Sequence, residues 1–537
     1  MLSFVVSVGW ESQLNRNTFD FRNADYESIG NAIRSINWND TLIAYPDARD
    51  LYRFLVCVLH ELMYEYIPLK KVSIEGIRIP QHILNLTQQK ERLWKEMRNN
   101  PQSKAKYERV SQWLKRECNK YYAIVERKII VNGKLKDLYR YISSGTRDKC
   151  KPTTALLYDK GCIITCETER AQLFARSFFS YFTTDDGKLP AVSSPYPNPV
   201  HAFPVIDFDV NMIASLINKW SISYSRTPDG LPMNFLKEIS SVVAIPICII
   251  FKRSLLTGEV PEFWKFAIVI PLPKKFPHNV VDNFRGVSIT SFACRVFEKI
   301  ISTYILKYSL SNEIMPREQH GFLKNRSRET AVLKALNDWT IALYKMKNID
   351  VIYFDFAKAF DRVSHSKLLY KLSSMGFPNH ITKWLQNWLV NRKFVVRCQN
   401  SFSDVYEVPS SVPQGSVLGP ILFNLYTADL AIELQKLSNI SFQLYADDIK
   451  IYNCYNSYDN QNEQASLQRA VDTVNRWSEL WQLPLSANKC QVLYLGKNNS
   501  KMDYSIGTTT LRKVSEVRDL GFIIDRKLDF SKHVKCM

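Results

Sequence analysis

The run Val351-Ile352-Tyr353-Phe354-Asp355 is almost entirely apolar and ends in a carboxylate. It predicts a β-strand buried on both faces, with Asp355 where the strand emerges. The pair Asp447-Asp448, which begins 92 residues after Asp355, lies between two further β-rich runs and predicts the tip of a hairpin. Buried like charges repel one another and are costly to desolvate, so clustered carboxylates rarely serve stability. Because two divalent cations relieve that repulsion, these segments together predict a two-metal site.

Each acidic residue also has a simpler interpretation when it is taken alone. Asp355, like the nearby Asp361, would be a strand cap, and Asp447-Asp448 would be ordinary turn residues. Turns favour Gly or Asn beside Asp, however, whereas both flanks of this tip look buried. The metal site is favoured once the three carboxylates are considered together with the motif between them.

That motif is the glycine-containing segment Val412 to Pro420, which leads into an apolar run. Gly415 allows the backbone to approach a ligand closely, and Pro420 suits the first turn of a helix. A turn of this kind can be a structural connector only. Its position between the two carboxylate segments favours the other interpretation, in which this turn lines the cleft that holds nucleotide and template.

Charge along the chain points to a polyanionic partner. The formal net charge is +19, and Lys90 to Lys151 holds 18 Lys/Arg against 7 Asp/Glu, which is +11 of that excess. One interpretation is a solvated basic helix face. The other is a nucleic-acid surface, because aromatic residues interleave with the cations, although they would equally form the buried stripe of the helices. These aromatic residues are Trp94, Tyr107, Trp113, Tyr121, Tyr122 and Tyr139.

Cysteines and apolar runs indicate an intracellular protein. The 11 cysteines are scattered, and only Cys162 and Cys166 lie close together, without a second pair at zinc-ligand spacing. Reduced thiols are the simple interpretation. Met1 to Trp10 lacks the basic start of a signal peptide. The longest apolar run, Val242 to Phe251, contains Pro246 and is about half a membrane span. We expect no membrane segment and a location in the nucleus or cytoplasm.

Periodicity predicts an α+β organisation with a mostly antiparallel sheet. Residues 1 to 75 and 84 to 144 predict helices within a basic N-terminal region, 1–182, followed by a proline-rich linker, 183–209. Beyond the linker, helices are predicted at 211–220, 293–311 and 329–347. Short strands are predicted at 267–271, 351–356, 394–398, 442–445, 449–452 and 490–495.

Several segments in order resemble reverse transcriptases of non-LTR (LINE-type, jockey-like) retrotransposons. Three segments resemble the family's motifs A, B and C, in that order: Phe354 to Asp361, Pro413 to Pro420 and Tyr445 to Asp448. Asn283 to Ser288 resembles a fingers motif but has Gly286-Val287 where Pro-Ile is usual. Further similar segments are Thr227 to Pro232, Trp264 to Lys275, Gln319 to Phe322, Ala487 to Cys490 and Asp519 to Phe522. The resemblance is strong over 210–535 and weaker over 15–145.

The resemblance implies a right-hand polymerase with fingers and palm. Residues 210–253 would lead into the fingers, 254–525 would form fingers and palm, and 526–537 would begin a truncated thumb. Two Mg²⁺ ions, for which Mn²⁺ would substitute, would be held by Asp355, Asp447, Asp448 and the carbonyl of Phe356. Lys489 would be the general acid that protonates pyrophosphate, although an ordinary surface lysine is the plain alternative.

The resemblance also implies how nucleotide and primer are held. Phe360 would be the steric gate that excludes a 2′-hydroxyl, although a core phenylalanine is the plain alternative. Arg285, with Lys274 or Lys275, would grip the triphosphate. The remaining contacts, to nucleotide and template and to the primer end, would come from Gln414, Gly415 and Tyr445, with Leu520-Gly521 near the primer grip.

The expected activity is RNA-directed DNA polymerisation, with RNA template, DNA primer, RNA–DNA hybrid and dNTPs as partners and no membrane. Family members commonly begin with an endonuclease, and no nicking activity is expected of this chain. One alternative is a catalytically silent RNA-binding remnant that works through its basic segment. Another is an RNA-copying viral polymerase, against which the bulk of Phe360 argues. The sequence leaves the oligomeric state open.

Overall fold

The computed structural model describes residues 17–71, 80–97, 104–131, 157–159, 162–164, 166–190, 196–223, 225, 227–456 and 460–536. The expectations for Met1 to Trp10 and for Tyr139 lie outside these residues. The chain divides into two compact units. The first consists of Met1–Phe19 and Leu69–Ala155, and the second consists of Asp20–Pro68 and Leu156–Met537.

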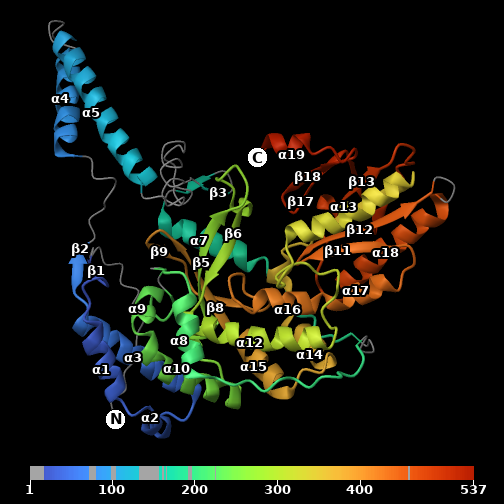
Figure 1. Ribbon diagram of the computed structural model, residues 1–537, viewed down its shortest axis with the longest axis horizontal. Helices are drawn as coiled ribbons and strands as arrows, with labels where there is room; N and C mark the ends of the chain where they lie inside the picture. Colours follow the sequence, from blue (N-terminus) through green and yellow to red (C-terminus); the bar gives the residue numbers. More distant parts are fainter. Residues whose placement is uncertain are drawn as a thin grey trace. The chain divides into compact units, whose positions relative to one another are not determined.

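The first unit is built on two long helices, α4 (Gln81–Met97) and α5 (Lys104–Val131), which lie side by side (Figure 1). Ile83 and Leu86 of α4 are buried between them. The unit also contains β1 (Asn17–Phe19) and β2 (Leu69–Lys71), which pair antiparallel. These two segments were expected to be helical. Pairing between segments far apart in the chain overrides local periodicity here.

The second unit begins with α1 (Tyr26–Ser35), α2 (Trp38–Ala44) and α3 (Ala48–Tyr66). Each helix follows a capping Asp or Asn whose side chain accepts backbone N–H bonds, as Asp47 does from Arg49 and Asp50. Tyr52 of α3 donates a 2.7 Å hydrogen bond to Asp229, within the segment expected to lead into the fingers. The N-terminal helices are thereby tied to the part of the unit that follows the predicted linker.

A five-stranded first sheet has the order β11-β12-β7-β13-β16. Its strands are β7 (Asn348–Phe354), β11 (Ser441–Tyr445), β12 (Asp448–Tyr455), β13 (Gln491–Leu495) and β16 (Arg512–Val514). All neighbours are antiparallel except β13 and β16. The central strand β7 is covered by α13 (Arg328–Tyr344), whose Trp339 packs with Val351 in one core. Figure 1 shows α13 and α18 (Asn460–Leu480) on opposite faces of this sheet.

A second sheet has the order β10-β8-β5-β6, with β9 paired to β8. Its strands are β5 (Phe266–Pro273), β6 (Phe284–Ile289), β8 (Arg392–Cys398), β9 (Ser401–Phe402) and β10 (Tyr406–Val408). The strands β5 and β8 run parallel, so the α+β architecture is confirmed with sheets that are mixed. α7 (Glu167–Phe179) covers this sheet through Phe174 and Phe178.

The remaining elements connect and cover the two sheets. Further helices and 3-10 turns are α8 (Val210–Lys219), α9 (Met233–Glu238), α10 (Ser240–Thr257), α11 (Glu262–Lys265), η3 (Val281–Asn283), α12 (Phe292–Ser311), η4 (Ala359–Arg362), α14 (His365–Ser374), α15 (Asn379–Leu389), α16 (Gly419–Tyr426), α17 (Ala428–Gln435), η5 (Ala487–Lys489) and α19 (Ser531–Cys536). Three two-stranded ribbons complete the unit: β3 (Leu157–Asp159) with β4 (Cys162–Ile164), β14 (Ser505–Ile506) with β15 (Thr509–Thr510), and β17 (Glu516–Asp519) with β18 (Phe522–Asp525).

The structure bears on two expectations from the sequence, which are the absence of a membrane segment and the proline-rich linker. Within the described residues one helix, α10, is long and apolar enough to cross a membrane by length and composition, with a mean hydropathy of 1.6. It packs against α3, α8 and α15, as a core helix would, and the expectation of no membrane segment stays a prediction. The start of the predicted linker is anchored, because Asp185 accepts a 2.8 Å hydrogen bond from Ser364 and Asp186 pairs with Lys367 at 3.1 Å.

Candidate active site

The carboxylates predicted from the sequence lie at one end of the first sheet. Asp355 follows β7 directly, and β11 and β12 form a hairpin in which Tyr445 pairs with Asp448. Ile449 pairs with Phe354, so one further step of the antiparallel register sets Asp448 across from Asp355. Residues opposite each other in such a pair have Cα atoms about 4.5–5.5 Å apart. The backbones of two acidic residues that are 93 positions apart in the chain therefore lie at adjacent strand ends.

The tip of that hairpin is held by a side chain that sequence reasoning did not single out. Ala446 has a left-handed backbone (φ 55°), which is unfavourable for alanine. The Gln319 side-chain oxygen accepts hydrogen bonds from the backbone N–H of Ala446 at 3.0 Å and of Gly321 at 2.8 Å. A Cβ on Gly321 would lie 2.6 Å from the Ala446 nitrogen. Glycine is thus required for this close approach, and the Gly in the Gln319 to Phe322 motif was the available signal.

Electrostatic repulsion shapes the protonation of the hairpin carboxylates. Burial, together with the charge of Asp355, raises the pKa of Asp447. Desolvation by the surrounding protein, followed by the charges of Asp447, Asp519 and Asp355, raises the pKa of Asp448 to about 7. The Asp448 side chain nevertheless reaches the solvent-exposed surface of the pocket. The positive charge of Lys274 lowers the pKa of both Asp447 and Asp448, so this ammonium acts electrostatically on the two carboxylates.

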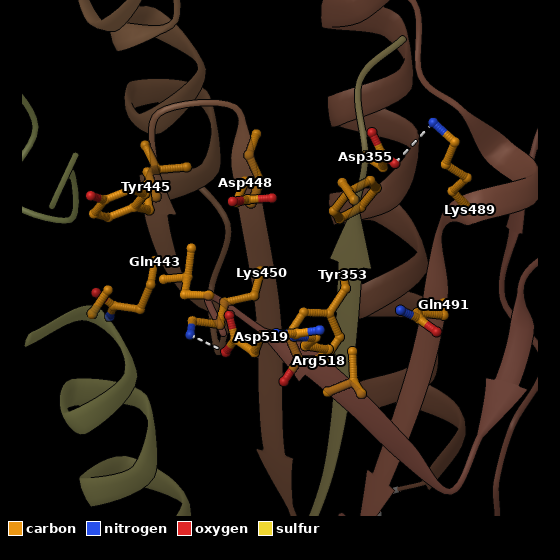
Figure 2. Close-up of a pocket in the computed structure, with 16 residues that line it drawn as sticks. Tyr353, Asp355, Gln443, Tyr445, Asp448, Lys450, Lys489, Gln491, Arg518 and Asp519 are labelled. Carbon is orange, nitrogen blue, oxygen red and sulfur yellow. Dashed lines mark hydrogen bonds and ion pairs between the residues drawn. The ribbon is translucent and has the colours of Figure 1, made fainter. Parts of the chain in front are cut away.

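The side chain of Asp355 is turned away from the hairpin. Its carboxylate pairs with the Lys489 ammonium at 3.3 Å, and the two side chains are 43% and 57% exposed (Figure 2). Across the residues that the structure describes, no three His, Cys, Asp or Glu side chains are gathered for a metal ion. Carboxylate oxygens are nevertheless the ligands that Mg²⁺ takes, and their mutual repulsion is what a cation relieves. The oxygen ligands present are therefore of the type that Mg²⁺ prefers. Rotation of the exposed Asp355 side chain away from Lys489 would bring its carboxylate toward those of Asp447 and Asp448.

A pocket of about 170 Å³ opens beneath these carboxylates. The predicted residues in its lining are Asp355, Tyr445, Asp448, Lys489 and Leu520, the last of which lies in the turn of the β17–β18 ribbon. Its floor holds the buried pair Lys450–Asp519, with nitrogen and oxygen 2.5 Å apart. The Tyr353 hydroxyl, also in the lining, is buried and has no hydrogen-bond partner among the described residues. Lys450 could have been noticed in the sequence as a charge inside the apolar strand run Ile449 to Tyr452.

The other predicted residues lie outside the pocket lining. Phe360, on η4, stacks on Phe423 of α16 with ring centroids 4.5 Å apart and an interplanar angle of 18°. The Gln414 carbonyl accepts a hydrogen bond from the Ser288 N–H at 2.9 Å. Gly415 has φ 109°, and a Cβ there would lie 2.5 Å from the Ser288 oxygen. The glycine turn is thereby fitted against β6 of the second sheet.

The two basic residues predicted for the triphosphate lie at the end of the second sheet. Arg285 is exposed on β6, opposite Leu272 of β5. Lys274 follows β5, is exposed, and donates its backbone N–H to Asn283 at 2.7 Å. Phe356 is buried, and its neighbour Ala357 donates a hydrogen bond to Pro484. These positions bring the predicted residues to the ends of both sheets rather than into one closed cavity.

A second anchor that the sequence did not reveal lies behind the glycine turn. Glu298 of α12 is fully buried, and its carboxylate accepts hydrogen bonds from the backbone N–H of Val417 at 2.6 Å and of Leu418 at 3.4 Å. It also accepts from the Trp388 indole at 3.1 Å. These amides precede α16, where unpaired N–H groups favour a negative charge. A lone Glu within an apolar helix was the only sequence signal.

The site thus combines acidic residues at the ends of adjacent antiparallel strands with a glycine turn that packs against the second sheet. Residues 272–524 match the family "Reverse transcriptase (RNA-dependent DNA polymerase)". The chain therefore contains a reverse transcriptase domain that is distantly homologous to those of non-LTR retrotransposons, and the predicted resemblance is confirmed.

Two Drosophila melanogaster proteins illustrate the similarity. The chain is 26% identical over 383 residues to "Probable RNA-directed DNA polymerase from transposon BS", which covers 69% of this chain and 42% of that protein. It is 25% identical over 405 residues to "RNA-directed DNA polymerase from mobile element jockey", covering 72% and 43%. The matched region thus spans less than half the length of these curated relatives. A truncated apo telomerase from Candida Tropicalis aligns with a TM-score of 0.34 at 13% identity, over 56% of this chain and 68% of that one.

Proposed function

We propose that this protein is an RNA-directed DNA polymerase that adds dNTPs to a primer 3′-hydroxyl on an RNA template. The observation that carries the proposal is the cross-strand placement of Asp448 and Asp355, with Asp447 at the adjoining hairpin tip. The family match supports the reaction type. The proposed location is inside the cell, in the nucleus or cytoplasm, where dNTPs and transcripts are present.

Asp355, Asp447 and Asp448, with the carbonyl of Phe356, would hold two Mg²⁺ ions, or Mn²⁺ in their place. Bound there, the ions supply a lowered pKa for the primer hydroxyl and charge stabilisation at the α-phosphate. The chain's own part is to present deprotonated carboxylates from rigid strand ends. Because the pKa of Asp448 is raised to about 7, this group would release a proton as a cation binds at neutral pH.

Lys489 would change partners during the reaction. In this structure its ammonium neutralises Asp355. When Asp355 turns toward Asp448, Lys489 loses that partner at the edge of the same pocket and would donate a proton to the leaving pyrophosphate. Its exposed position and its short ion pair with a proposed metal ligand support this role.

The second sheet would hold the nucleotide. Arg285 and Lys274 would grip the triphosphate, since both are exposed cations and the Lys274 charge reaches the carboxylates. Phe360, held flat against Phe423, would stand under the sugar. Backbone at Gln414 and Gly415 would contact nucleotide and template, and Tyr445 would touch the primer end.

Primer extension on poly(rA)/oligo(dT), with and without Mg²⁺, tests the proposal. Wild-type protein should extend the primer, whereas Asp447→Asn and Asp355→Ala should fall by at least about a thousandfold. Asp404→Asn, which removes an exposed carboxylate on the β9–β10 connection, is the matched control and should extend normally. Normal extension by Asp447→Asn or Asp355→Ala refutes the metal assignment. Absence of extension by the wild type with intact RNA binding favours the alternative of a silent RNA-binding protein.

A further inference from the structure

The basic segment predicted from the sequence resolves in α5 into two faces of different chemistry. Residues that pack toward α4 are half-buried and mostly uncharged, and they include Tyr107, Leu114 and Tyr121. The aromatic side chains Tyr107 and Tyr121 therefore belong to the helix–helix contact. Trp113 does not, because it is 56% exposed. The structure thus separates aromatic residues that build the helix pair from one that is free to meet a ligand.

Trp113 lies within a row of exposed side chains spaced three or four residues apart, which places them on one face of the helix. We name this row the α5 basic face; its members are Lys106, Arg109, Trp113, Arg116, Lys120, Ile124 and Arg127. At about 1.5 Å rise per residue, the row is roughly 30 Å long. It therefore offers cations over the length of several nucleotides.

The composition of this face is that of a binding surface rather than a solvated one. Of the cations on this face, Lys120 forms an ion pair, with Glu117 at 2.9 Å. Lys106, Arg109 and Arg116 form none with any residue that the structure describes. Trp113 and Ile124 are each 56% exposed between these cations. The exposed side chains of the neighbouring helix α4 are mostly uncharged, among them Gln81, Asn85, Gln88 and Gln89, and its exposed Arg92 is accompanied by an exposed Glu96.

We propose that the α5 basic face binds single-stranded RNA. Cations at this spacing would contact successive phosphates, and the Trp113 indole would stack on an unpaired base. A duplex keeps its bases stacked on one another, so the exposed indole favours a single strand. The surface follows from α5 alone, whereas the choice of RNA over DNA rests on the proposed polymerase function.

Fluorescence anisotropy of the full-length protein with fluorescein-labelled oligouridine tests this site. The variant Lys106→Gln/Arg109→Gln/Arg116→Gln should bind at least about tenfold more weakly. Between about 50 and 200 mM KCl, its slope of log affinity against log salt should be smaller by about 2, since three phosphate contacts are lost. Trp113→Ala should lose roughly 5- to 100-fold with an unchanged salt slope, because stacking is not ionic.

The matched control removes the same charge from exposed lysines of the second unit: Lys219→Gln/Lys299→Gln/Lys307→Gln. It should bind oligouridine within about twofold of the wild type. Equal losses in the two triple variants would reduce the effect to net charge and overturn the site, as would wild-type binding by Trp113→Ala. Tighter binding of duplex RNA than of oligouridine would overturn the assigned partner. Extension of a short primer–template, measured on the same proteins, reports the polymerase separately, so a failure there leaves the binding result standing.

Discussion

Replacing Lys450 with methionine should destabilise the second unit by about 3–5 kcal/mol, because it leaves the Asp519 carboxylate buried and unpaired. The two side chains are only 4% and 6% exposed and meet at 2.5 Å, so water cannot replace the lost ammonium without opening the pocket floor. By contrast, Lys450→Met/Asp519→Leu removes both charges and should recover most of that loss. The difference between single and double variants measures the penalty of the isolated charge.

A surface ion pair of the same residue types supplies the control. Lys334 and Asp338 of α13 meet at 2.9 Å, with side chains 56% and 23% exposed. Lys334→Met should therefore change the free energy of unfolding by less than about 1 kcal/mol. Urea unfolding in EDTA, followed by circular dichroism and tryptophan fluorescence together, measures all four proteins. The reasoning fails if Lys450→Met lies within about 1 kcal/mol of the wild type, or if the double variant is no more stable than the single one.

Three further predictions concern the hairpin and the nucleotide side. The folded protein holds a proton on Asp448 up to its pKa of about 7, whereas the unfolded chain releases it near pH 4. The contribution of Asp448 to the free energy of unfolding therefore falls as pH rises from about 4 to 7. In EDTA, Asp448→Asn should remove that decline from the urea midpoints. Gly321→Ala forces a Cβ against the Ala446 nitrogen and should destabilise by about 1–3 kcal/mol and impair primer extension, whereas Gly30→Ala, where a Cβ would meet only a flexible arginine at 3.6 Å, should do neither. Phe360→Ala should admit ribonucleotides in extension assays, and unchanged sugar discrimination would leave Phe360 as a core residue stacked on Phe423.

Four strands of the first sheet, all except β16, could be predicted because they carry their own signal. The runs around Val351 and Ile451 are apolar over the length of a strand, and each begins or ends at a carboxylate. The same local logic failed at Asn17–Phe19, whose partner Leu69–Lys71 lies some 50 residues away. It was also incomplete at Asp185, because proline content describes the local backbone and gives no information about Ser364 as a partner.

The residues proposed to react were easier to predict than those that hold them in place, and the reason is physical. Asp355 and Asp448 occupy strand ends, where a short sequence pattern fixes both the element and the position of the side chain. Their supports, such as Gln319 and Glu298, act on backbone N–H groups of other segments, and almost any stretch of chain offers such groups. A single sequence therefore contains no pattern that identifies the backbone N–H groups to which these side chains bind.

The supports also explain how loop-borne groups can be placed for chemistry at all. A two-residue turn with a left-handed alanine and a glycine turn before a helix are each unfavourable conformations on their own. Gln319 fixes the first and buried Glu298 fixes the second, each through a pair of backbone N–H bonds. Because those bonds form only in the folded unit, the geometry of the hairpin and of the glycine turn depends on the placement of α12 and of the α12–α13 connection as much as on the motifs themselves.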